Sequence, residues 1–292
     1  MSGPSSSGPP SDGSAEGSTP PIPLHVEEHG SEGRPLVLVH GFGGHSYTWR
    51  FWTPRLAASY RIFLVDLKGH GASPKPDDDR YSPFDQADLL VRTLRTRGLE
   101  SATLVGHSLG GGIVLAAALQ LLETDPGRIH SLILVSAATR PQEIPRYIGW
   151  ARKPLVGRAF LHLVPPRLLM RWALRSIVYD PSDVTPGQVE AYAEPIRSWN
   201  DRRALLKGAR QIVPENAGDV VARYGSVDRP TLLLWGREDP VVPAELGREL
   251  AQVLPKARLE IVEKCGHLPQ EERPRASLNA VLDFLRNVQG GS

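Results

Sequence analysis

The 292-residue chain has a single cysteine, and its 34 basic and 32 acidic residues nearly cancel to a formal net charge of +2. One cysteine excludes an intramolecular disulfide. The near-neutral balance gives no general attraction to nucleic acid, and no nucleic-acid-binding motif accompanies the arginines. The 9 histidines show no spacing typical of a metal site. The composition therefore predicts no disulfide, no metal, no cofactor and no nucleic-acid partner.

Segments that would direct the chain into a membrane are also missing. No stretch approaches the roughly 20 apolar residues that a membrane span requires. The N-terminus lacks the basic start and apolar block of a signal peptide. We therefore expect a cytoplasmic protein with no integral membrane segment.

The first 23 residues have an unusual composition. They contain 4 Gly, 6 Pro and 7 Ser, and neither Lys nor Arg. Such a segment cannot bury enough apolar surface to offset the entropy of ordering it. The sequence predicts a disordered tail over residues 1–23.

Short apolar runs alternate with helical patterns along most of the remaining chain. Six of them span residues 36–39, 61–66, 102–106, 131–136, 230–235 and 257–262. Continuous apolar strands separated by helices are typical of a parallel sheet that is covered on both faces. The sequence therefore predicts a doubly wound, mostly parallel α/β fold, to which residues 24–28 add a short edge strand.

Residues 106–110 read Gly-His-Ser-Leu-Gly and lie between an apolar β-branched run and a helix-like stretch. This is the G-x-S-x-G pattern in the strand–turn–helix context of a nucleophile elbow. Glycines on both sides let the strand and the helix approach closely while the serine holds a strained backbone geometry. The alternative is a glycine-rich turn whose serine only caps the helix. The context favours Ser108 as a nucleophile.

A candidate acid and a candidate base follow the serine in the order that this arrangement requires. Asp239 lies in a polar turn after the run 230–235, and His267 lies in a loop after the run 257–262. His267 would accept the proton of Ser108, and Asp239 would fix the tautomer of His267 and stabilise the imidazolium. Glu143, the nearest carboxylate after the run 131–136, is the alternative acid.

Backbone N–H groups must also stabilise the charge that develops on a carbonyl oxygen during attack. The segment His-Gly-Phe-Gly-Gly at residues 40–44 follows the run 36–39, where such a loop belongs. The expected oxyanion-hole donors are the backbone N–H groups of Phe42 and Leu109. A dinucleotide fingerprint is excluded here, because Ser46 stands at the position of the third glycine.

With these motifs in one order, the chain resembles the α/β-hydrolase superfamily from about residue 24 to about residue 288. The matching segments are residues 40–44, 65–73, 106–110, 236–240 and 266–267. The resemblance implies a core formed by residues 24–140 and 216–292, with a helical cap inserted at 141–215. The segment 65–73 is expected to be a scaffold loop without a catalytic role.

The expected cap interrupts the alternation of strands and helices. It reads as short helices over residues 146–163, 166–178, 186–199 and 201–211. Three of the 6 tryptophans of the chain lie in it, namely Trp150, Trp172 and Trp199. Their contact area favours a medium-sized, partly apolar substrate. The alternative is that they pack the cap helices onto the core.

The expected cap is also basic, with 12 Lys or Arg against 7 Asp or Glu over residues 141–215. An anionic substrate or an acidic membrane surface could use this charge, but solvated arginine side chains also explain it and are the favoured interpretation. Arg171 and Arg175, four residues apart on one helical face, are the pair to test with an anionic substrate. Cys265 is interpreted as a small buried filler, with a redox role as the alternative.

The residue at the elbow limits the reaction. Haloalkane dehalogenases and epoxide hydrolases of this superfamily need a carboxylate where Ser108 stands. A serine with a histidine base predicts an acyl-enzyme formed from an ester, a lactone or a thioester, with water as the second reactant. The alternatives are C–C hydrolysis, as in meta-cleavage-product hydrolases, which typically carry asparagine where His107 stands; cofactor-free haloperoxidase or acyltransferase activity; and a triad-bearing ligand-binding protein.

Overall fold

The computed structural model describes residues 23–141, 148–149 and 152–289. Seven strands form one sheet in the order β1-β3-β2-β4-β5-β6-β7. They are β1 (His25–His29), β2 (Pro35–Val39), β3 (Arg61–Asp66), β4 (Ala102–His107), β5 (Ile129–Val135), β6 (Thr231–Gly236) and β7 (Ala257–Val262). Only β1 is antiparallel to its neighbour. The predicted doubly wound, mostly parallel sheet is confirmed.

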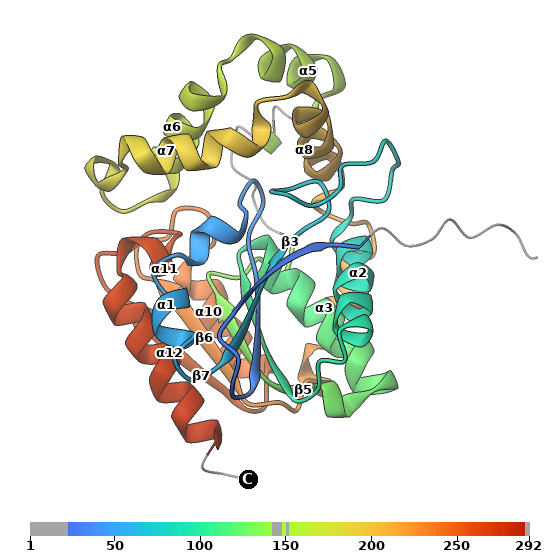
Figure 1. Ribbon diagram of the computed structural model, residues 1–292, viewed down its shortest axis with the longest axis vertical. Coiled ribbons are helices and arrows are strands. Elements are labelled where there is room, and N and C mark those ends of the chain that lie inside the picture. Colours follow the sequence, from blue (N-terminus) through green and yellow to red (C-terminus); the bar gives the residue numbers. More distant parts are fainter. Residues whose placement is uncertain (1–22, 142–147, 150–151, 290–292) are drawn as a thin grey trace, which may run out of the picture.

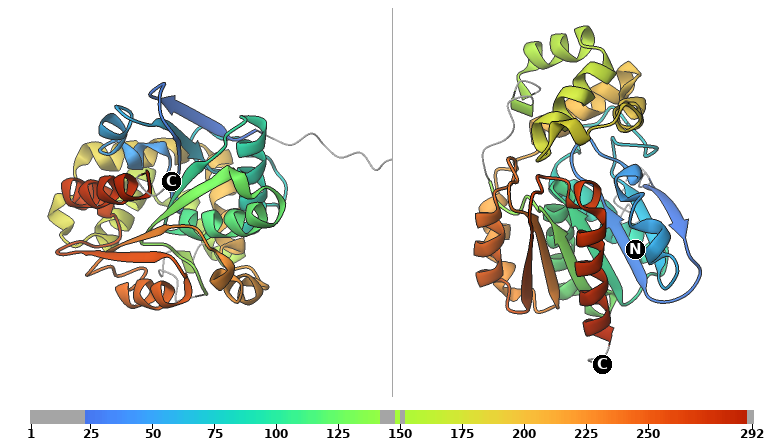
Figure 2. Two further views of the ribbon diagram at one scale, coloured as in Figure 1. Left: turned by 90° about the horizontal axis from the view of Figure 1, so that it is seen from below. Right: turned by 90° about the vertical axis from the view of Figure 1, so that its left-hand side faces the viewer.

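Helices cover both faces of this sheet (Figures 1 and 2). One face carries α2 (Pro83–Thr96), α3 (Leu109–Thr124) and α10 (Ala244–Val253), and the other carries α1 (Thr53–Leu56) and α12 (Pro274–Gln289). The short elements of the core are η1 (Ser46–Trp49), η2 (Pro126–Arg128), α9 (Ala217–Val221), η5 (Tyr224–Ser226) and α11 (Pro269–Glu272).

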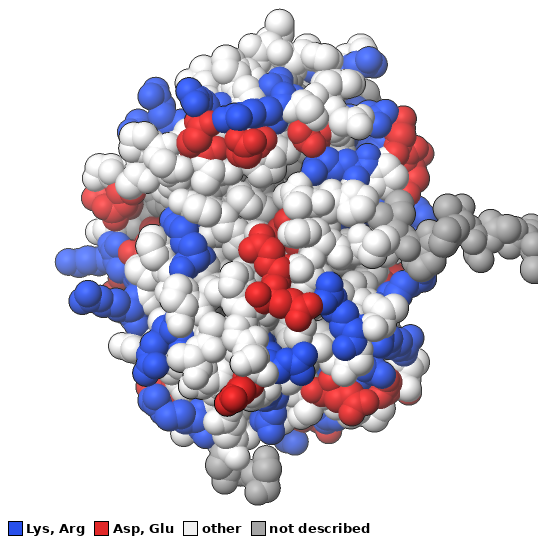
Figure 3. Space-filling view, in the orientation of Figure 1, with Lys and Arg blue, Asp and Glu red and all other residues white. Residues whose placement is uncertain are grey.

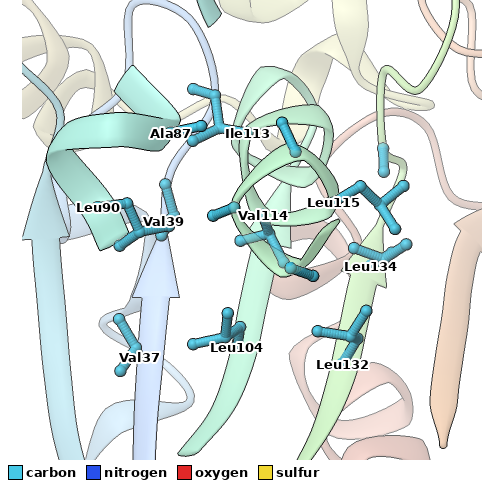
Figure 4. Close-up of a cluster of buried hydrophobic side chains, with 14 of the residues drawn as sticks. Val37, Val39, Ala87, Leu90, Leu104, Ile113, Val114, Leu115, Leu132 and Leu134 are labelled. Atoms are coloured by element: carbon cyan, nitrogen blue, oxygen red, sulfur yellow. The ribbon is translucent and has the colours of Figure 1, made fainter. Parts of the chain in front are cut away.

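Alternating side chains of each central strand enter two apolar clusters. On β2, Val37 and Val39 join the cluster under α2 and α3, whereas Leu36 and Leu38 join the cluster under α1 and α12. Both sets are fully buried, because a parallel sheet between two helical layers has no solvated face. Figure 4 shows side chains of β2, β4 and β5 facing those of α2 and α3. This packing fixes the carboxyl ends of the strands, from which the site is built.

Four helices form an upper helical layer, residues 152–211, between β5 and β6 in the sequence. They are α5 (Pro154–Leu163), α6 (Pro166–Ile177), α7 (Pro186–Ala193) and α8 (Trp199–Gln211), with the short η3 (Pro181–Asp183) and η4 (Glu194–Ile196) between them. Figure 1 shows this layer above the carboxyl ends of the parallel strands. The helix predicted over residues 146–163 is interrupted by a bend at Lys153, and α5 begins only at Pro154; residues 146–147 and 150–151 lie outside the described residues.

The boundaries of two upper helices have local causes. The helix predicted over residues 186–199 ends early, at Ala193, because Pro195 lacks a backbone N–H and the chain continues as a 3-10 turn. Helix α8 begins at Trp199 because Ser198 and Asp201 form a capping box, in which each side chain accepts the other's backbone N–H.

The expectations about a membrane span and about the N-terminal tail have different outcomes. Within the described ranges, no helix is both long and apolar enough to cross a bilayer. All but the last residue of the predicted tail, residues 1–23, lies outside the described residues.

Candidate active site

The turn between β4 and α3 gives Ser108 an unusual backbone. Its φ angle is +52°, a region that non-glycine residues rarely occupy. A Cβ on Gly106 would lie 2.4 Å from the carbonyl oxygen of Gly110, and a Cβ on Gly110 would lie 2.4 Å from that of His40. Both glycines are therefore required for the strand, the helix and the preceding loop to meet. This strained turn presents the Ser108 side chain at the carboxyl edge of the sheet.

Ser108, His267 and Asp239 form a continuous hydrogen-bonded chain. The Nε2 atom of His267 lies 2.9 Å from Ser108 Oγ, and its Nδ1 atom lies 2.8 Å from Asp239 Oδ2. A carboxylate only accepts, so Nδ1 carries the proton and Nε2 can accept the hydroxyl proton of Ser108. The structure thus brings together three residues that are separated by 131 and 28 positions in the sequence.

Asp239 is held as an anion in a buried position. Its Oδ1 atom accepts the backbone N–H groups of Val241, at 2.8 Å, and Val242, at 2.9 Å. Burial alone would raise the pKa of Asp239, but the charge and hydrogen bond of His267, with these two amides, outweigh burial and lower that pKa. The carboxylate therefore stays charged beside the imidazole at neutral pH.

The backbone of His267 is fixed from two sides. Its N–H donates to the carbonyl oxygen of Ile177 at 2.8 Å, and its own carbonyl accepts from Nε2 of His107 at 2.8 Å. Burial, followed by the charge of His267, lowers the pKa of His107 to about 3, so the His107 ring is neutral. Neither contact was predicted from the sequence. The one available signal was the histidine at position 107, directly before the nucleophile in the G-x-S-x-G pattern.

The loop at residues 40–44 approaches the nucleophile closely. A Cβ on Gly41 would lie 2.9 Å from Ser108 Cβ, so only glycine fits there. His40 supports the loop: its Nε2 accepts from the Leu67 N–H at 3.0 Å, and its Nδ1 therefore donates to the Gly41 carbonyl at 2.7 Å. Burial lowers the pKa of His40 to about 3, which keeps this tautomer neutral.

The two expected oxyanion-hole residues lie on either side of the serine. Phe42 belongs to the loop after β2 and lines the same cavities as Ser108. Leu109 is the first residue of α3, where the backbone N–H groups of a helix have no intrahelical acceptor. The role of these two N–H groups as oxyanion-hole donors stays a prediction.

Two cavities meet at Ser108, and the second is slightly the larger. Both are lined by Phe42, Ser108, Ile148 and Val241. The first extends toward α9 and η5, and the second extends under the upper helical layer. The apolar lining of the second consists mainly of Leu169, Met170, Ala173, Leu174, Ile177, Leu205 and Leu268. A substrate bound on both sides of Ser108 would therefore contact mostly apolar surface.

Of the three tryptophans expected to contact substrate, two lie away from the cavities and the third lies outside the described residues. Trp172 is 41% exposed on α6, and Trp199 stacks on His162 with ring centroids 3.8 Å apart. Neither is among the described residues that line the two cavities. Trp150 and the alternative acid Glu143 lie outside the described residues. Aliphatic side chains of the upper layer, and not its tryptophans, thus supply the described apolar lining.

Other candidate chemistry finds little support at this site. Cys265 is fully buried in the apolar cluster under α12, and burial raises the pKa of its thiol, which suits a filler and opposes a reactive thiolate. Among the described residues, no group of three or more His, Cys, Asp or Glu could hold a metal ion. Arg171 and Arg175 are exposed and do not line either cavity.

The chain is similar to known proteins over most of its length. The sequence model of the alpha/beta hydrolase fold family matches residues 34–274. The chain is 31% identical over 272 residues to a 2-hydroxymuconate semialdehyde hydrolase of Pseudomonas sp. (strain CF600), covering 89% of each chain. Its structure is similar to that of an alpha/beta hydrolase fold protein from Burkholderia ambifaria, with a TM-score of 0.79, 30% identity, and coverage of 89% and 93% of the two chains.

A second solved structure that is similar to this one is named for its enzymatic activity. The meta-cleavage product hydrolase of Pseudomonas fluorescens IP01, as a mutant complexed with acetates, gives a TM-score of 0.74 at 25% identity and covers 90% and 94% of the two chains. The similar proteins therefore span nearly the whole chain, including the upper helical layer.

Proposed function

The chain belongs to the alpha/beta hydrolase fold family and is an enzyme of hydrolase type, and from this premise we propose that it is a serine hydrolase with an acyl-enzyme intermediate. Its substrate is a medium-sized, mostly apolar ester, lactone or thioester. Ser108 is the nucleophile and His267 is the general base and acid. Asp239 orients His267 and stabilises its protonated form. Residues 141–215 act as a cap that selects the substrate.

In the first half-reaction, Ser108 Oγ forms a bond to the substrate carbonyl carbon while its proton moves to His267 Nε2. The backbone N–H groups of Phe42 and Leu109 stabilise the oxyanion. When the tetrahedral intermediate collapses, His267 gives this proton to the leaving oxygen or sulfur. Water then attacks the acyl-enzyme with His267 as base, and release of the acid restores Ser108.

One observation carries this proposal: the hydrogen-bonded hydroxyl of Ser108 lies where two apolar cavities meet. A carbonyl carbon positioned there has room for an acyl group on one side and a leaving group on the other. Strained serine geometry and a base at 2.9 Å serve covalent attack. A protein that only binds a ligand needs neither the strained serine nor the nearby base.

C–C hydrolysis is the second candidate, because several curated relatives are named as hydrolases of 2-hydroxy-6-oxononadienedioate. The word dioate denotes two carboxylates, which lose hydration on entering an apolar cavity and need cationic partners. Among the described residues that line the two cavities, the only Lys or Arg is Arg140. That guanidinium forms an ion pair with Glu249. The described lining therefore favours an uncharged substrate.

The test compares the wild type with Ser108→Ala on p-nitrophenyl butyrate and on a 2-hydroxy-6-oxo-dienoate. Ser101→Ala is the matched control, because Ser101 also has a positive φ, +49°, but lies at the opposite end of β4. We expect ester cleavage that is lost only in Ser108→Ala, by about 10⁴-fold or more. Ester cleavage that survives in Ser108→Ala would contradict the proposed nucleophile. Cleavage of the dienoate alone would replace ester hydrolysis with the second candidate.

A further inference from the structure

The outer surface of α5 and α6 exposes an unusual number of large apolar side chains. Eight large hydrophobic side chains of the described residues are exposed, and six of these lie within residues 155–179. They are Leu155, Val156, Leu163, Leu168, Trp172 and Tyr179. Leu155 is 84% and Leu163 is 81% exposed. These six side chains, together with the Lys and Arg residues at positions 152–179, are called the outer surface.

The charge of the same segment has one sign. Residues 152–179 contain six Lys or Arg and no Asp or Glu. They are Arg152, Lys153, Arg158, Arg167, Arg171 and Arg175. Arg167 forms an ion pair with Glu190, and Arg158 lies over the Trp199 ring. In Figure 3 the upper end of the molecule is white and blue, and Asp and Glu begin below it on this face.

The two faces of helix α6 have different surroundings. Its inward face carries Leu169, Met170 and Leu174, which are buried and line the larger cavity. Its outward face carries Leu168, Arg171, Trp172 and Arg175, which are exposed. Their spacing of three and four residues places them on one side of the helix. The outward face is therefore a mixed apolar and basic stripe on the far side of the cavity wall.

We propose that the outer surface docks on an anionic phospholipid bilayer. A helix with Leu and Trp beside Lys and Arg lies in the plane of a membrane interface, with its apolar side chains among the acyl chains and its cations at the headgroups. Trp and Tyr, which have an apolar body and a polar edge, suit the same depth. Negative headgroups supply the charge that residues 152–179 lack.

A second copy of the chain is less suited to bind the outer surface, because both partners would carry positive charge there. A two-fold contact brings the same patch of both copies together. It would therefore place two segments against one another, each with six Lys or Arg and no Asp or Glu, although one of the six, Arg167, is paired with Glu190. The like charges would repel in a contact from which water is excluded, whereas an anionic bilayer neutralises them.

The docking proposal does not need the proposed function, but the substrate that it implies does, because that substrate is an ester. The cavity next to Ser108 lies directly behind α6, whose last residue Ile177 accepts the backbone N–H of His267. A protein that lies on the bilayer through α5 and α6 would have its apolar cavity close to substrates dissolved in the membrane. We infer that the natural substrate is a lipophilic ester taken from an anionic bilayer.

The experiment measures co-sedimentation of the full chain, carrying Ser108→Ala to prevent turnover, with vesicles. One set of vesicles is phosphatidylcholine, and the other is an equimolar mixture with phosphatidylglycerol. We expect binding to the anionic vesicles only, and weaker binding at high salt. Each basic residue contributes about fivefold to partitioning. Arg171→Gln/Arg175→Gln should therefore lower the partition coefficient by about 25-fold, and Leu155→Ser/Leu163→Ser should also lower it.

Arg92→Gln/Arg95→Gln is the matched control, because both residues are exposed neighbours on one side of α2 and their loss changes the net charge equally. Equal loss of binding in this control, or no binding to either vesicle, would overturn the docking proposal. So would concentration-dependent dimers that Leu155→Ser/Leu163→Ser abolishes in the absence of vesicle binding. Since this readout needs no catalysis, its failure is distinguishable from inactivity toward p-nitrophenyl butyrate.

The substrate inference has its own measurement with active enzyme. We expect Arg171→Gln/Arg175→Gln to slow hydrolysis of p-nitrophenyl decanoate in anionic vesicles and to leave hydrolysis of soluble p-nitrophenyl acetate unchanged. An equal loss on both esters would contradict delivery from the bilayer and would indicate damage to the site.

Discussion

The sheet core and the upper helical layer differ in how completely they are packed. In the core, strands β2, β4, β5 and β6 are buried along almost their whole length between two large apolar clusters. The upper layer has one smaller cluster and six of the eight exposed large hydrophobic side chains. The core therefore fixes the reacting atoms, while the upper layer offers an apolar lining on its inner side and a contact surface on its outer side.

Polar contacts join the two regions at several places, including ion pairs from Lys75 to Asp201 and from Asp77 to Arg203 and Lys207. The buried carboxylate of Glu271, on α11, accepts from Thr48 and Arg50 of the core. It also accepts from Gln188 and Tyr192 of α7. Together with the bond between His267 and Ile177, this cluster links the core to the layer above. Changes inside one packed region, away from these contacts, should still have different effects from changes inside the other.

The largest expected effect concerns the charge in the core. Asp239→Asn should lower kcat for ester hydrolysis by about 10⁴-fold. The amide oxygen of asparagine can still accept the Val241 and Val242 N–H groups, but its NH₂ group would face His267 Nδ1 and favour the wrong tautomer. Steady-state kinetics with Glu143→Gln as the control provide the measurement. Full activity in Asp239→Asn, with loss in Glu143→Gln, would transfer the acid role to Glu143.

A pair of glycine variants tests the difference in packing directly. Gly110→Ala should lower the free energy of unfolding by about 2–3 kcal/mol, because its Cβ would lie 2.4 Å from the His40 carbonyl oxygen. Gly187→Ala in α7, which has no atom within 4 Å of its Cβ position, should change it by less than about 1 kcal/mol. Guanidinium unfolding measures both. Similar values for the two variants would remove the contrast between core and upper layer.

Substitutions of cavity and core residues should separate selectivity from stability. Met170→Ala enlarges the larger cavity, so we expect the kcat/KM ratio of long to short p-nitrophenyl esters to rise by about tenfold. Leu134→Ala in β5, fully buried in the core, should instead cost about 2–5 kcal/mol of stability. Unchanged chain-length preference in Met170→Ala, with a loss of stability as large as that of Leu134→Ala, would contradict the proposed division.

The last expected effect is a dependence of stability on pH that originates in the core. Burial lowers the pKa values of His40, His70 and His107 to about 3, from 6.5. The unfolded chain therefore binds protons first as the pH falls. The free energy of unfolding is highest above about pH 6.5 and decreases toward pH 3 by about 1.4 kcal/mol per pH unit for each histidine.

Unfolding at a series of pH values measures this slope. His70→Phe should reduce it by the share of one histidine, since His70 packs against the rings of His40 and Phe42. His162→Phe on the exposed surface of α5 is the control. A slope that His70→Phe leaves unchanged would show that these buried rings do not carry the pH dependence.

Much of the core was predictable because its signals are local. The six predicted apolar runs fall on β2 to β7 within two residues at each end, and the edge strand at residues 24–28 falls on β1. The helix over residues 186–199 was predicted too long because Pro195 interrupts it. The roles of His107 and Ile177 could not be predicted, since a hydrogen bond to a backbone carbonyl distant in sequence leaves no pattern.

The sequence by itself determined the order of the elements, the G-x-S-x-G turn and the candidates Ser108, Asp239 and His267, because apolar periodicity and close backbone approach constrain neighbouring residues. Only the tertiary structure decided how these three side chains meet, which residues line the two cavities, and that α6 lines a cavity with one face and exposes the other. Such relations depend on distances between segments far apart in the chain. Those distances are set by packing, which short-range patterns do not encode.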